Sequence, residues 1–292
     1  MVVAQRYELR RLIGRGGMGE LWEGVDVRLN RQVALKRVRQ DRITEEFVRR
    51  FKREARIMAL LRHPGVPVVY DFGEDEHGLF LVMEFIDGWT LTDVLDAHDR
   101  LPVAWTALIG AQLCAALAAA HDHSLVHRDL KPGNLMLRRD ATLVLLDFGV
   151  AAVPGSPEFS VITGTLGAPG TDRYMAPEQA YGGKTNALTD LYSVGCILYE
   201  MLTGQVFHTT TGGHLFPTPY PAALLETSAP RELDALVTAL LDEDPGRRPQ
   251  RANEVFHRLL PFVQKLPPLP GVIDRAPRPI HLYAGAVSRI GW

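Results

Sequence analysis

Short apolar runs separated by turn residues dominate the first 86 residues and predict β-strands. The runs are rich in Val, Leu, Tyr and Phe and are divided by turns that contain Gly, Asn or Asp; they cover 7–14, 20–27, 32–38, 66–74 and 79–85. One long charged helix, about Thr44 to Arg62, interrupts them, because its apolar residues recur on a single helical face. We therefore expect five antiparallel strands and one helix in this part of the chain.

From Thr90 onward the pattern is mainly helical, with a short strand pair expected at 135–139 and 142–148. Residues 101–120 contain no charged residue and are long enough to span a bilayer. The run is rich in Ala, however, and Pro102 stands where a helix would begin. A helix buried in the core of the protein is therefore the better interpretation.

These patterns predict an α+β protein of two lobes, with the joint near Gly88. We expect one domain over 7–265, made of a small lobe (7–86) and a large lobe (87–265). Residues 266–292 carry five prolines between 267 and 279 and predict a linker or a loosely packed tail. A polyproline ligand is the alternative interpretation of that stretch.

Composition excludes several classes of protein. With 46% hydrophobic and 23% charged residues the chain is not wholly disordered, and a net charge of −2 indicates neither nucleic acid nor an anionic membrane as a partner. Two cysteines, Cys114 and Cys196, do not supply a disulfide framework or a zinc site. A reducing cytoplasm is the expected compartment.

The first candidate for chemistry is a glycine-rich stretch, LIGRGGMGEL, in which Gly14, Gly16 and Gly19 lie between two predicted strands. Glycines in a hairpin let the backbone approach phosphate oxygens where a Cβ would collide. Dinucleotide-binding folds share this spacing but need a helix immediately afterwards, and ELWEGVDV predicts a strand. The flanking structure therefore disfavours a dinucleotide site.

Lys36 shares one face of its predicted strand with Ala34 and Val38, an unusual place for a cation unless it snorkels to water. Glu54 falls on the apolar stripe of the predicted helix, where an unpaired carboxylate is costly. The two residues are obvious partners. Such an ion pair would hold the ammonium where it can meet phosphate.

The loop LVHRDLKPGNLML brings three polar side chains together between apolar runs. Asp129 can accept a hydroxyl proton, Lys131 can neutralise a transferring phosphoryl group, and Asn134 can offer an oxygen to a hard cation. Asp147 follows at the end of a predicted strand. Asn134 and Asp147 supply two oxygen ligands, the number that Mg²⁺ usually takes from a protein.

With these motifs in this order, residues 7–262 resemble the eukaryotic-like (Hanks-type) protein Ser/Thr kinases of bacteria. The resemblance implies a two-lobed kinase fold that phosphorylates Ser and Thr of proteins with ATP and Mg²⁺, or with Mn²⁺. It implies that Lys36 pairs with Glu54, that Asp129 and Lys131 serve catalysis, and that Asn134 and Asp147 hold the metal. The nucleotide would contact Ile13, Gly14, Arg15, Gly16, Gly17, Met18, Gly19, Glu20, Leu21, Ala34, Lys36, Met83, Glu84, Phe85 and Met136.

The resemblance also assigns structural roles. Asp190 would brace the catalytic-loop backbone, and Glu178 would form a buried pair with Arg248. Thr171 would touch both Asp129 and Lys131.

Control by autophosphorylation is expected at Thr163, Thr165 or both, where a phosphate could pair with Arg128.

Two alternatives stay open, together with features that the sequence leaves undetermined. A pseudokinase scaffold would bind nucleotide without transferring phosphate, but Lys36, Asp129 and Asp147 are intact. A small-molecule kinase would lack the long segment from Asp147 to Ala176-Pro177-Glu178. After Gly204 the chain departs from the family pattern, so substrate choice is not transferable. The resemblance also implies a homodimer through the small lobe, although no single residue proves it.

Overall fold

The computed structural model describes residues 1–16, 19–38, 44–147, 171–211, 214–217, 229–263 and 266–273. Contacts divide them into two compact units. The smaller comprises Met1–Arg62 and Val66–Ile86, and the larger comprises His63–Gly65 and the described residues from Asp87 onward.

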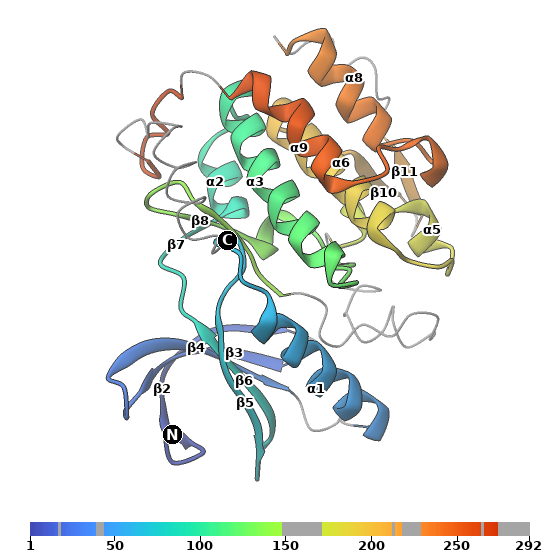
Figure 1. The fold of residues 1–292 in the computed structure, drawn as a ribbon. Coiled ribbons are helices and arrows are strands. Elements are labelled where there is room, and N and C mark those ends of the chain that lie inside the picture. The colour runs from blue at the N-terminus through green and yellow to red at the C-terminus, as the bar shows by residue number, and fades with distance from the viewer. Residues whose placement is uncertain are drawn as a thin grey trace. The chain divides into compact units, whose positions relative to one another are not determined.

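The smaller unit is an antiparallel sheet with one helix (Figure 1). Within the described residues its strands follow the order β1-β2-β3-β4-β6-β5. They are β1 (Val2–Val3), β2 (Tyr7–Gly16), β3 (Gly19–Asp26), β4 (Arg31–Val38), β5 (Val69–Asp75) and β6 (Gly78–Glu84), and the helix is α1 (Glu45–Leu60). The five predicted strands and the helix are confirmed. Strand β1 was not expected, because two residues are too few to show a periodic pattern.

Helix α1 begins where its sequence provides a cap: the Thr44 side chain accepts a hydrogen bond from the Phe47 amide at 3.1 Å. Its predicted apolar stripe is buried, with Phe47 and Met58 only 4% and 2% exposed. Glu54 lies half-buried beside that stripe. A separate apolar cluster packs within the sheet, formed by Val3, Tyr7, Leu9, Val33, Leu35, Phe80 and Val82.

The larger unit is mainly helical (Figure 1). Its helices are α2 (Leu91–Ala97), α3 (Val103–Asp122), α5 (Pro177–Ala180), α6 (Ala187–Thr203), α8 (Arg231–Leu240) and α9 (Ala252–Leu259). Its strands are β7 (Gly88–Thr90), β8 (Leu135–Arg138), β9 (Leu143–Leu145), β10 (His208–Thr211) and β11 (His214–Pro217). The predicted strand pair is β8 and β9, to which β7 adds a third strand that was not expected.

Helix α3 is the apolar run that the sequence singled out. By length and composition it could cross a membrane, but 67% of its most apolar window is buried inside the larger unit. A Cβ at Gly110 would approach Leu198 of α6 to 2.6 Å and Leu259 of α9 to 3.0 Å, so the glycine permits close packing with both helices. The interpretation as a core helix is confirmed.

The beginning of the predicted tail differs from expectation. Leu266, Leu269, Val272 and Ile273 are all buried, and Leu269 and Ile273 form a β-bridge. The indole nitrogen of the fully buried Trp105 donates to the Pro267 carbonyl at 2.6 Å. Residues 266–273 are therefore packed on the larger unit and are not a loose linker, because four apolar side chains among the prolines are buried. The rest of the tail lies outside the described residues.

Candidate active site

Asp129 lies in the loop between α3 and β8, where two side chains hold its carboxylate. Lys131 Nζ donates to both oxygens, at 3.2 and 2.9 Å. Asn134 Nδ2 donates to the Asp129 carbonyl at 2.7 Å and to its Oδ2 at 3.2 Å. The three residues that the sequence placed in one loop therefore form one cluster.

The backbone before Asp129 is fixed by Asp190 of α6. The Asp190 carboxylate accepts hydrogen bonds from the amides of His127 (2.9 Å) and Arg128 (2.8 Å), as predicted. Arg128 adopts a φ of +67°, which is uncommon for a residue with a side chain and persists only where its surroundings enforce it. Gln179 Nε2 adds to this restraint by donating to the Arg128 carbonyl at 2.8 Å.

Asn134 and Asp147 are brought together by backbone contacts. The Leu146 amide donates to the Asn134 carbonyl at 2.8 Å, and His127 Nε2 lies 2.7 Å from the Leu146 carbonyl. Asp147 itself is half-buried with a φ of +53°. Because the side-chain nitrogen of Asn134 donates to Asp129, the side-chain oxygen of Asn134 can coordinate a cation. An amide oxygen and a carboxylate suit Mg²⁺, so the donor set fits the predicted metal.

In the smaller unit, strand register places predicted nucleotide-contacting residues on one face of the sheet. Leu21 of β3 pairs with Lys36 of β4, and Ala34 of β4 pairs with Met83 of β6. Directly paired residues project to the same face, as do residues two apart on a strand. Leu21, Ala34, Lys36 and Met83 therefore share that face.

The glycine-rich hairpin joins β2 to β3, and its ends are paired as Gly16 with Gly19 and Arg15 with Glu20. The Arg15 and Glu20 side chains form an ion pair at 2.7 Å. A Cβ at Gly19 would collide with the Arg37 carbonyl, so this position requires glycine. A Cβ at Gly14 would have no described atom within 4 Å, so packing does not require glycine there and the space is open to a ligand.

The remaining predicted site residues are placed as follows. Ile13 lies at a register shift of β2 and is 42% exposed, and Met136 of β8 is half-buried opposite Thr90. Glu84 and Phe85 are half-buried at and just after the end of β6. Gly17, Met18, Thr163 and Thr165 lie outside the described residues, and so does the Thr171 side chain.

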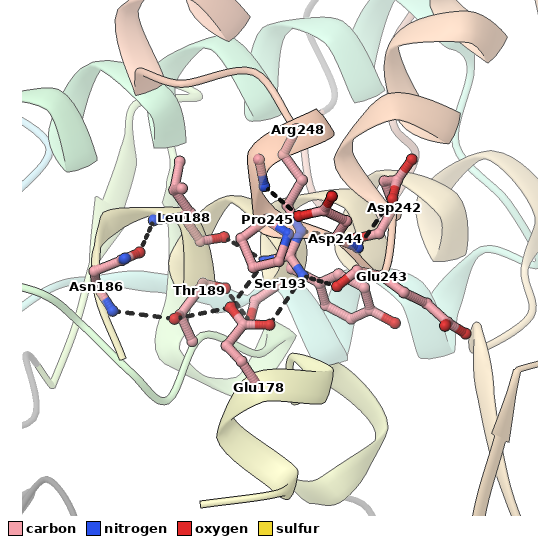
Figure 2. Close-up of polar contacts among 12 residues, drawn as sticks. Glu178, Asn186, Leu188, Thr189, Ser193, Asp242, Glu243, Asp244, Pro245 and Arg248 are labelled. Carbon is pink, nitrogen blue, oxygen red and sulfur yellow. Dashed lines mark hydrogen bonds and ion pairs between the residues drawn. The ribbon is translucent and has the colours of Figure 1, made fainter. Parts of the chain in front are cut away.

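Glu178 and Arg248 form the predicted buried pair (Figure 2). Arg248 donates from Nη1 and Nη2 to the two Glu178 oxygens, at 2.8 and 2.9 Å, and its side chain is wholly buried. Thr189 Oγ1 of α6 also donates to Glu178, at 3.1 Å. Burial raises the pKa of Glu178, but the hydrogen bonds from Arg248 and Thr189 outweigh burial, and the net pKa lies below its ordinary value.

A second carboxylate anchors the end of the long segment that runs from Asp147 to Ala176-Pro177-Glu178. Tyr174 donates its hydroxyl to Glu200 of α6 at 2.6 Å, and Ser193 donates to the Tyr174 carbonyl at 2.7 Å. Burial raises the pKa of Glu200, against the opposing hydrogen bond from Tyr174. Residues 174–178 are thus fixed to α6 by Ser193, Glu200 and Thr189.

Sequence reasoning missed three residues that position the catalytic loop. His127 is fully buried and bridges the loop to Leu146, Gln179 holds Arg128, and His121 Nε2 lies 2.8 Å from Asp190 Oδ2. The only available signal was a histidine in an apolar run directly before Arg128-Asp129. The other two contacts join residues far apart in the chain.

The smaller unit is an antiparallel sheet with one helix, and the larger unit is mainly helical and carries the loop in which Lys131 and Asn134 contact Asp129. Together these features define the catalytic domain of a protein kinase. Comparison with known proteins agrees. The family description "Protein kinase domain" matches residues 7–260. Serine/threonine-protein kinase PknB of Mycolicibacterium smegmatis is 36% identical over 99% of this chain and 48% of its own length.

Probable serine/threonine-protein kinases of Streptomyces coelicolor and Clostridium perfringens are 38% and 36% identical, over 86% and 87% of this chain and 39% and 38% of their own lengths. The chain belongs to the protein kinase family, as a catalytic domain of the bacterial Hanks-type serine/threonine class. It spans about half the length, or less, of the curated relatives it matches. Members of this family generally use ATP and Mg²⁺.

Proposed function

We propose that this chain transfers the γ-phosphoryl group of ATP to Ser and Thr hydroxyls of proteins. The observation that carries the proposal is the Asp129 carboxylate, which Lys131 and Asn134 hold while Asp190 fixes the backbone before it. A general base must be positioned before its proton affinity matters. This loop positions one.

In the proposed reaction the substrate hydroxyl oxygen attacks the γ-phosphorus, and the bond from that phosphorus to the bridging oxygen of ADP breaks. The hydroxyl proton passes to the Asp129 carboxylate. Lys131, whose ammonium lies beside that carboxylate, neutralises charge on the transferring group. ADP and the phosphorylated hydroxyl are the products.

We propose that the nucleotide contacts the residues that the resemblance assigned. Leu21, Ala34 and Met83 would pack against adenine, with Ile13 and Met136, and the backbone of Glu84 and Phe85 would meet its edge. The hairpin from Gly14 to Glu20, including Arg15, Gly16, Gly17, Met18 and Gly19, would cover the phosphates. Lys36 would contact the phosphates while paired with Glu54. The shared face of Leu21, Ala34, Lys36 and Met83 supports this set.

We propose that Asn134 and Asp147 hold Mg²⁺, which Mn²⁺ can replace. When bound, the metal neutralises phosphate charge. The protein's own contribution is to keep the two oxygen donors together through the contact of Leu146 with Asn134. MgATP and MnATP should both support turnover, whereas CaATP should not.

The acceptor is tested by incubating the chain with γ-labelled ATP, Mg²⁺ and a generic basic protein, followed by phosphoamino-acid analysis. Label on phosphoserine and phosphothreonine is expected. Label only on phosphotyrosine, or only on small molecules, would contradict the proposal. Nucleotide binding with no label transferred by wild-type protein would identify a pseudokinase.

We propose that activity is raised by autophosphorylation at Thr163, Thr165 or both. A phosphate there supplies acceptor oxygens for a guanidinium such as that of Arg128. Mass mapping after incubation with ATP should find phosphate at these threonines. The Thr163→Ala/Thr165→Ala variant should lose activity on other proteins, and the matched Ser156→Ala/Ser160→Ala variant should not. Phosphate found only elsewhere would exclude this control.

We further propose a domain over 7–265 in the cytoplasm, acting on protein substrates and pairing through the smaller unit. Burial raises the pKa of the unpaired thiols Cys114 and Cys196, which suits a reducing compartment. The described surface of the smaller unit exposes Val27 and Leu29, 51% and 59% accessible, and these support self-association. Sedimentation at rising concentration tests the dimer.

A further inference from the structure

One face of α1 carries a row of cations. Arg49, Lys52, Arg53 and Arg56 are all exposed, whereas Phe47, Phe51, Ala55 and Met58 of the same helix are buried. Their spacing of three, four and seven residues places them side by side on one helical face. We call these four residues the α1 basic row; Figure 1 shows the helix that carries them, drawn in blue.

The α1 basic row is not neutralised by the part of the chain that the structure describes. No hydrogen bond or ion pair joins any of the four to another described residue. Arg49 with Arg53, and Lys52 with Arg56, are like charges one turn apart, an arrangement that weakens a helix. In helix α9 the same spacing of four residues joins opposite charges, in the Glu254–Arg258 ion pair.

The chemistry of an occupant follows from the two faces of α1. The apolar stripe of α1, formed by Phe47, Phe51, Ala55 and Met58, is already buried, and Leu60 at its end is 72% exposed. One exposed side chain is too little apolar surface to insert the helix into a lipid surface. What remains is the positive charge of the α1 basic row, which complements carboxylates. The row extends over eight residues, from Arg49 to Arg56, which is about 10 Å along the helix axis. Alternate side chains of an extended peptide lie about 7 Å apart.

We propose that the α1 basic row docks an acidic, extended segment of a partner protein, with two or three alternate Asp or Glu side chains meeting the four cations. The site is separate from the residues assigned to nucleotide and catalysis. Binding is electrostatic, so it weakens as salt screens the charges.

The experiment measures fluorescence anisotropy of a labelled peptide with Glu at alternate positions, against wild-type protein and the variant R49Q/K52Q/R56Q. Gln keeps a helix propensity close to that of Arg and Lys, so α1 should persist. The control R10Q/R231Q/R251Q removes the same charge from exposed arginines elsewhere. We expect about a tenfold loss of affinity in the first variant and less than twofold in the control.

Two further arms keep the test decisive. The single variant Arg49→Gln should weaken binding about twofold, in case the triple variant is unstable. A peptide with Lys in place of Glu should not bind. Equal losses in both triple variants, no binding to wild-type protein, or tighter binding to phosphatidylserine vesicles than to the acidic peptide would each overturn the proposal.

Discussion

The Asp129 carboxylate owes its position to contacts at two sequence distances. Lys131 and Asn134 reach it from within its own loop, whereas the backbone before it is fixed by Asp190, 63 residues beyond His127. The local contacts follow from a contiguous motif and could be predicted from the sequence. The distant ones depended on a family resemblance, and the roles of His127 and Gln179 depended on the fold itself.

Asp147→Asn should abolish turnover while leaving the fold intact. Asn is among the few residues that readily adopt the positive φ seen at Asp147, so the backbone is preserved, but the charge that suits a cation is lost. We expect turnover to fall at least about a hundredfold. The melting temperature should change by less than about 3 °C, the shift that about 1 kcal/mol produces in a domain of this size.

The exposed Asp140 provides the matched control, since Asp140→Asn changes the same charge in a turn of the larger unit. Its turnover should stay within twofold of wild type. Near wild-type turnover in Asp147→Asn would remove the metal assignment, and unfolding would show that Asp147 is mainly structural.

Glu178→Ala should cost about 3 kcal/mol of unfolding free energy. Removing Glu178 leaves the fully buried guanidinium of Arg248 without its carboxylate partner, so that among the described residues it keeps carbonyl acceptors such as Leu188 O and Asp242 O. Denaturant unfolding measures the loss. Glu254→Ala, which breaks the half-exposed pair with Arg258, should cost less than about 1 kcal/mol. Similar losses in both variants would show that burial of the Glu178–Arg248 pair adds nothing to the free energy of unfolding.

The same pair should make stability depend on acid. The pKa of Glu178 is lower in the folded chain than in the unfolded one, so its contribution is complete above the unfolded value of about 4.5 and is lost as pH falls through the folded value. The difference in melting temperature between wild type and Glu178→Gln should therefore be constant near neutrality and shrink below about pH 4.5. A difference that stays constant in acid would disagree with a lowered pKa.

At the scale of elements, the hydrophobic pattern predicted the longer strands and helices and missed the shortest strands. Apolar residues recur in strands β2 to β6 and in helix α1, and α3 is a long apolar run without a charge, so these elements could be predicted from the sequence. Strands β1 and β7 have two and three residues and exist because a neighbouring strand pairs with them. The prediction of a loose segment at 266–273 is wrong. It rested on the prolines, whereas Leu269, Val272 and Ile273 are buried.

Ending the chain after Lys265 should destabilise the larger unit relative to a chain ending after Ile273. The longer chain keeps four buried apolar side chains and the Pro267 carbonyl that accepts from Trp105. Without them the indole loses its partner, and we expect a loss of about 3 kcal/mol or more. Thermal melting and a red shift of tryptophan emission measure it. Equal stability of the two chains would mean that the segment merely rests on the surface.

At the scale of the whole molecule, family membership and catalytic function rest on different grounds. Membership follows from a match over residues 7–260 and from relatives 36–38% identical. Function follows from the loop that holds Asp129, because a kinase fold with a displaced carboxylate would bind nucleotide without transferring phosphate. The Asp129 loop is therefore where the account is most directly open to test.

The decisive measurement is the single-turnover rate of γ-phosphoryl transfer by wild type and Asp129→Asn, with nucleotide affinity measured in parallel. Asn keeps the shape of the side chain but cannot accept the hydroxyl proton as a carboxylate does. We predict similar nucleotide affinity in the two proteins and a rate of transfer at least about a hundredfold lower in the variant. Equal rates in the two proteins, or nucleotide binding without transfer by wild type, would contradict it.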